Sequence, residues 1–110
     1  MNPLPIEVRE ARQAGPISYI VKYQADVELL DGSQPVSVEM LSVFPPDSSA
    51  EQAEVGRQMI QRGAARALDG TGKSARLRVR DFVIHPVDFH PKRIEEFTFR
   101  AVRDALDSAR

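Results

Sequence analysis

The stretch 17–30, in which apolar and polar residues alternate, constrains the fold more than any other part of this chain. Alternation with a period of two is typical of a β-strand that is buried on one face only. Such a strand needs neighbouring strands for its backbone groups and an apolar layer for its buried face. We therefore expect a sheet with one covered face, to which this strand contributes Tyr19, Val21, Tyr23, Ala25, Val27 and Leu29.

Three further segments have a strand pattern, at 3–10, 36–44 and 75–87. Prolines at the start of the first segment confine it to a sheet edge or to the beginning of a strand, because proline cannot donate to the ladder. The sequence DGS at 31–33 favours a tight hairpin, so we expect 17–30 and 36–44 to be neighbours. The second of these strands would place Val36, Val38, Met40 and Phe44 on the covered face, and Leu41 and Val43 on the opposite face.

The first segment with helical spacing is 48–70. Ser48 begins a capping-box sequence, and Gly70 fits the position just beyond the end of the helix. Gly56 and Gly63 lie on the apolar stripe, where a glycine costs about 0.5–1 kcal/mol relative to alanine. We therefore expect another part of the backbone to pack closely against these two positions.

The second helical segment is 90–110. His90 occupies the N-cap position, and Pro91 fits the first helical position, where its missing N–H costs nothing. The predicted order of elements is therefore β-β-β-α-β-α. This order predicts a single α+β domain over 1–110, a two-layer sandwich with a four-stranded sheet and two helices on one face. In element order it resembles the fourth domain of translation elongation factor G, and this resemblance implies the fold alone.

Charge and composition exclude several classes of function. Fifteen basic and 16 acidic residues give a net charge of −1, which argues against binding nucleic acid or an anionic membrane through bulk charge. The absence of cysteine excludes disulfides, thiolate catalysis and cysteine-ligated zinc. The N-terminus has no signal-peptide pattern, and no apolar run approaches the ~20 residues of a membrane span. We expect a cytoplasmic protein without a membrane partner.

Arg76, Arg78 and Arg80 share one face of the predicted strand 75–87. Such a stripe could bind an anion or a nucleic-acid backbone. The neighbouring strands, however, carry carboxylates on the same predicted face, and opposite charges pair across a sheet. We expect these arginines to pair within the sheet, with Asp26, Glu28 and Glu39.

Both histidines of the chain lie in the segment HPVDFHP, 85–91. His85, Asp88 and His90 could supply a metal site or an acid–base site, because imidazole and carboxylate suit zinc and proton transfer. Their spacing matches no strong metal signature, and both histidines precede proline, which favours extended backbone. We expect a plain strand-to-helix connection, with neither metal nor cofactor and no catalytic residues.

The leading functional hypothesis is a small non-enzymatic protein-interaction domain, most simply a homo-oligomer. Apolar side chains cover about 200° of the second helix, wider than the ~100° stripe of an ordinary surface helix. Either a partner covers the additional side chains or the first helix does. The interface candidates are Phe99, Val102 and Leu106 on this helix, with Leu41 and Val43 on the sheet. The alternatives are nucleic-acid or anion binding through the arginine stripe and a metal or acid–base site at the histidines.

Overall fold

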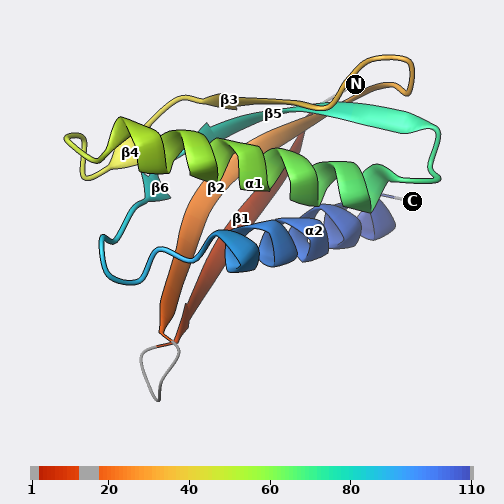
Figure 1. Ribbon diagram of the computed structural model, residues 1–110. Coiled ribbons are helices and arrows are strands. Elements are labelled where there is room, and N and C mark those ends of the chain that lie inside the picture. Colours follow the sequence, from red (N-terminus) through yellow and green to blue (C-terminus); the bar gives the residue numbers. More distant parts are fainter. Residues whose placement is uncertain (1–2, 13–17, 110) are drawn as a thin grey trace.

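The computed structural model describes residues 3–12 and 18–109, and it confirms a two-layer α+β fold (Figure 1). One layer is a four-stranded sheet in the order β1-β2-β5-β3. The other layer consists of two helices that lie on the same face of this sheet. The four strands are β1 (Leu4–Arg12), β2 (Tyr19–Asp31), β3 (Ser37–Met40) and β5 (Lys73–Arg80); the helices are α1 (Ala50–Leu68) and α2 (Pro91–Ser108); β4 (Val43–Phe44) and β6 (Phe82–Val83) form a separate two-stranded sheet.

The prediction of a hairpin between the second and third strands is wrong. β2 pairs antiparallel with β5, and β3 pairs parallel with the other side of β5. The DGS sequence does form a turn, in which the backbone N–H of Ser33 donates to Asp31 Oδ1 at 2.9 Å. A Cβ on Gly32 would lie 2.4 Å from the carbonyl oxygen of Gly72. The glycine therefore permits a close approach to the turn that leads into β5, the strand that separates β2 from β3.

The third predicted strand, 36–44, is broken after Met40. Beyond this break, the residues that face the core are the reverse of those expected. The backbone N–H of Leu41 still donates to Val79 O at 2.8 Å, after which Ser42 O accepts from the N–H of Phe82 at 3.1 Å. Beyond this break β4 pairs with β6 instead of β5. Phe44, expected on the covered face, is 61% exposed, and Val43, expected on the opposite face, is half-buried and packs against the core. Residues alternate between the two faces within β3 and within β4, as predicted. The alternation does not continue from one strand to the other, because the chain breaks after Met40.

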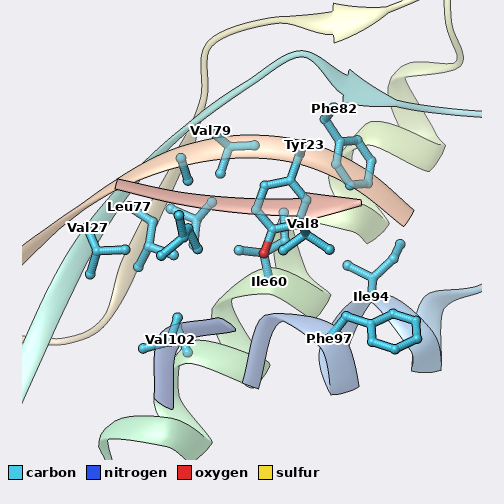
Figure 2. Packing of buried hydrophobic residues seen from close by; sticks show 14 of the residues in the cluster. Val8, Tyr23, Val27, Ile60, Leu77, Val79, Phe82, Ile94, Phe97 and Val102 are labelled. Carbon is cyan, nitrogen blue, oxygen red and sulfur yellow. The ribbon is translucent and has the colours of Figure 1, made fainter. Parts of the chain in front are cut away.

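The core lies between the sheet and the two helices (Figure 2). Tyr23 reaches across it, and its hydroxyl lies 2.6 Å from Thr98 Oγ1 on α2. A Cβ on Gly63 would lie 2.4 Å from the backbone oxygen of Glu95, which confirms close backbone packing between α1 and α2. At Gly56 the close neighbour is instead the ring of Phe82.

The ends of the helices differ slightly from the prediction. The N-cap of α1 is Ser49, whose side chain accepts from the N–H of Gln52 at 3.2 Å. Ser48 lies one residue too early, and its hydroxyl donates to Pro45 O at 2.5 Å. Gly70 has a φ of +77°, as expected for the residue beyond the end of a helix.

The beginning of α2 follows the prediction, with His90 at the N-cap and a proline at the start of the helix. The Gly-Pro pair at 15–16 favours a turn over 12–16, but this segment lies, apart from its first residue, outside the described residues. The final residue of the second predicted helix also lies outside them. In the part of the chain that the structure describes, neither helix is long and apolar enough to cross a membrane.

Candidate interaction surfaces

The arginine stripe of β5 lies on the face of the sheet opposite α1 and α2, and each of its guanidinium groups is paired. The nitrogen–oxygen distances are 3.3 Å for Arg76–Glu28, 3.8 Å for Arg78–Glu39 and 2.7 Å for Arg80–Asp26. The strand register explains the first two pairs, because Glu28 lies opposite Arg76 on β2 and Glu39 lies opposite Arg78 on β3. Exposed pairs of this kind contribute about 0–1 kcal/mol to stability, but they leave the stripe with little free positive potential.

The HPVDFHP segment bends, so that His85 and Asp88 meet. His85 Nδ1 lies 3.4 Å from Asp88 Oδ2 and accepts from the backbone N–H of Asp88 at 3.3 Å. The hydroxyl of Ser18 donates to the other carboxylate oxygen, Oδ1, and Asp88 O accepts from the N–H of Ile20 at 3.2 Å. These bonds attach the segment to the beginning of β2.

The order in which Ser18, Asp88 and His85 contact one another limits the chemistry of the HPVDFHP segment. In a nucleophilic triad the imidazole lies between the hydroxyl and the carboxylate, whereas here the carboxylate of Asp88 lies between Ser18 and His85. His90 does not join them, and its Nδ1 is buried with no hydrogen-bond partner in the described part of the chain. No group of three potential metal ligands occurs among residues 3–12 and 18–109. The arrangement fits a connection between a strand and a helix.

The wide apolar arc of α2 is largely covered within the subunit. Val102 is fully buried in the core, and Leu106 is half-buried and packs against it. Phe99 is half-buried beneath two cations, since the guanidinium carbons of Arg66 and Arg103 lie 4.6 and 5.5 Å from its ring centroid. The helix α1 and these arginines therefore supply most of the cover that a partner was expected to give.

An apolar groove lies between the β3–β4 segment and the first half of α1. We call it the β4 groove; it has a volume of about 560 Å³ and is lined by Met40, Leu41, Ser42, Val43, Pro46, Ala50, Ala53, Glu54 and Arg57. Leu41 is 49% exposed beside it. The sequence marked Leu41 and Val43 as additional apolar surface, but the break after Met40 moves both to this groove.

A second hollow surface follows the outermost strand. Figure 1 shows β1 at one edge of the sheet, where, within residues 3–12 and 18–109, β2 is its single partner strand. Two grooves of about 410 and 200 Å³ lie between this strand and α2, and both are lined by Glu7, Ala101 and Asp104. The prolines of the first segment predicted the edge, but no signal in the sequence placed α2 beside it.

Comparison of the sequence with models of protein families and with curated proteins gave no match. The surfaces themselves are therefore the basis for a functional hypothesis.

Proposed function

We propose that this chain is a non-enzymatic protein-interaction domain that acts as a homo-oligomer and binds an apolar segment of a partner protein in the β4 groove. The observation that carries the proposal is the groove itself, with Leu41 half exposed at its side. Large apolar side chains that remain beside a hollow on a folded domain are typical of a contact site for another protein.

The charges at the rim of the groove favour an apolar ligand. Arg57 Nε donates to both carboxylate oxygens of Glu54, at 2.8 and 3.0 Å, and its Nη1 donates to Gln61 Oε1 at 3.1 Å. The hydrogen bond from Arg57 lowers the pKa of the Glu54 carboxyl, so the pair stays charged and mutually neutralised at neutral pH. A charged segment would gain little from this rim, whereas an apolar one gains about 25 cal/mol for each Å² of apolar surface removed from water.

The other two hypotheses receive less support. The arginine stripe is occupied by carboxylates of the same sheet, which supports a protein partner over nucleic acid. The contacts of His85 and Asp88 are accounted for by the attachment of their loop to β2.

A peptide selection tests the proposal. A random peptide library displayed on phage is selected against the immobilised domain, and the affinities of the enriched peptides are measured by calorimetry. We expect apolar peptides that bind Leu41→Ser roughly 10- to 100-fold more weakly, since burying a leucine contributes about 1.5–3 kcal/mol. Val87→Ser is the matched control, because Val87 is 82% exposed and does not line the groove. Enriched peptides that bind both variants equally well, or a selection that enriches none, would overturn the groove as the contact site.

A further inference from the structure

We propose that β1 pairs antiparallel with β1 of a second copy, about a two-fold axis at Val8, so that the two sheets join into one. This inference rests on the homo-oligomer in the proposed function and does not depend on the β4 groove. The two sheets would form a continuous eight-stranded sheet with all four helices on one face.

The edge at β1 is long, and among the described residues no strand pairs with its outer side. β1 has nine residues, whereas β3 at the opposite edge has four. A long edge strand presents a row of unpaired backbone groups to another chain. Pro5, which has no N–H, is tolerated in a strand where its nitrogen faces away from the neighbour, here β2. Backbone groups of successive residues in a strand point to alternate sides. Glu7 and Arg9 lie two and four residues after Pro5, so their N–H and C=O groups also face the free edge.

Charge and length select the register. Opposite residues must lie on the same face of the sheet, so the axis of an antiparallel self-pairing passes through a single residue. An axis at Val8, the middle of Leu4–Arg12, sets the whole strand opposite its copy and sets Glu7 opposite the partner's Arg9, twice. Pro5 then lies opposite the partner's Ala11 and can only accept a hydrogen bond there, so the ladder is complete only around Glu7, Val8 and Arg9. An axis at Glu7 or at Arg9 instead sets two like charges directly opposite each other, which is destabilising.

The Val8 register also uses the backbone groups at the edge. Glu7 and the partner's Arg9 both present outward N–H and C=O groups, so they form a pair that exchanges two hydrogen bonds. Val8 then faces the partner's Val8 as a pair without hydrogen bonds, in which the two Cα atoms lie about 4.5 Å apart. Within one chain Glu7 and Arg9 form only an exposed ion pair of 3.3 Å, which pairing between strands can replace at little cost.

The grooves between β1 and α2 add a second layer to this contact. The groove beside Leu4 is lined by Ala105 and Ser108, and the one beside Glu10 is lined by Phe97 and Arg100, so α2 runs antiparallel to β1. A two-fold axis at Val8 therefore brings the two α2 helices together in opposite directions. The grooves between β1 and α2 then become covered.

A charge exchange tests the pairing. Sedimentation equilibrium should give a dimer for the wild type. Arg9→Glu should weaken it roughly tenfold or more, because it sets Glu7 opposite a second carboxylate on both sides of the axis. The double variant Glu7→Arg/Arg9→Glu should restore the dimer, since it reverses both charges. Both side chains are exposed, and circular dichroism verifies that the variants fold.

Disulfide trapping tests the register in the same protein. The chain has no cysteine, so Val8→Cys introduces a single thiol, and two such thiols at the axis are close enough to form a disulfide. Ser37→Cys, on the opposite edge strand, is the control and should remain reduced under the same mild oxidation. A wild type that stays monomeric at high concentration would overturn both this pairing and the homo-oligomer, and it would leave peptide binding in the groove unaffected. A dimer that survives Arg9→Glu and gives no cross-link in the Val8→Cys variant would overturn the pairing and leave the homo-oligomer standing.

Discussion

Tyr23 shows how one buried polar atom links the two layers. Its side chain is 1% exposed, and Figure 2 shows its hydroxyl on the helix side of the sheet. The hydrogen bond between this hydroxyl and Thr98 Oγ1 satisfies two buried polar groups at once. Burial raises the pKa of Tyr23 well above its usual range, and the bond to Thr98 lowers it only in part.

Tyr23→Phe should destabilise the protein at neutral pH and make it less sensitive to alkali. The loss of the hydrogen bond should reduce the free energy of unfolding by about 1–3 kcal/mol, because Thr98 is left buried with an unpaired hydroxyl. The folded pKa of Tyr23 is raised, so its contribution is fully present below the unfolded pKa of about 10 and decreases as the pH rises above it. The variant should lack this decrease.

Urea unfolding at pH 8 and pH 11 measures both effects. Tyr19→Phe serves as the control, and it should keep the alkaline decrease because Tyr23 remains. An equal alkaline decrease in wild type and Tyr23→Phe would contradict the assignment.

At the scale of the elements, the contact between α1 and α2 holds the two helices together. Their caps set where the helices begin and end. Gly63 lets the two helix backbones approach, and the neighbouring Thr98 continues the contact into the core. The same approach covers Val102 and brings Arg66 over Phe99. The pairing of the helices is therefore the reason that the wide arc of α2 does not require a partner.

Gly63→Ala should destabilise the fold although alanine favours a helix. The new Cβ would lie 2.4 Å from Glu95 O and 2.8 Å from Thr98 Cβ, so the helices must separate. Overpacking costs about 1–3 kcal/mol, which exceeds the gain of up to about 1 kcal/mol in helix propensity. Thermal unfolding measures the difference, with Gln58→Ala on the exposed side of α1 as the control. An increase in the melting temperature would contradict the close approach.

Ser49→Ala should reduce the free energy of unfolding by about 1 kcal/mol, because it removes the side-chain acceptor for the N–H of Gln52. Ser48→Ala should have a smaller effect, since the Ser48 hydroxyl bonds to Pro45 O outside the helix. Chemical denaturation of both variants distinguishes the two caps. A larger effect at Ser48 would restore the capping box expected from the sequence.

At the scale of the whole molecule, one face of the sheet is covered by helices and the other is a charged surface. Among the residues described, the uncovered face of β2, β3 and β5 carries the three arginine–carboxylate pairs. Association with a polyanion depends on free cations that release counterions from it. We therefore expect this internal pairing to weaken nonspecific binding of nucleic acid.

The wild type should bind DNA or RNA more weakly than about 10⁻⁴ M at physiological salt. The triple variant Asp26→Asn/Glu28→Gln/Glu39→Gln removes three negative charges and frees the arginine stripe, so it should bind more tightly and with a steeper dependence on salt. Fluorescence anisotropy with a labelled duplex measures both proteins. Micromolar binding by the wild type that fades with added salt would favour the nucleic-acid hypothesis.

Local sequence by itself determined the two helices, the four strands of the main sheet and the buried face of each, but not the separate strands β4 and β6 or the faces of Val43 and Phe44. The alternation in 17–30, the helical spacing in 48–70 and the proline after His90 act between near neighbours, so each could be inferred without knowing the rest of the fold. The candidate surfaces were predicted only in part. Leu41 and Val43 were expected on the opposite face of the sheet, whereas both line the β4 groove. The carboxylate partners of Arg76, Arg78 and Arg80 were anticipated from their shared face.

Only the tertiary structure decided which elements became neighbours. The DGS turn predicts a hairpin, but α1 returns the chain so that β5 lies between β2 and β3. The break after Met40, the bend that brings His85 to Asp88 and the cover over Phe99 all depend on contacts between residues far apart in the sequence. Such contacts are selected by the packing of the whole core, because the best arrangement for one local segment is kept only when it lets every other segment bury its apolar face.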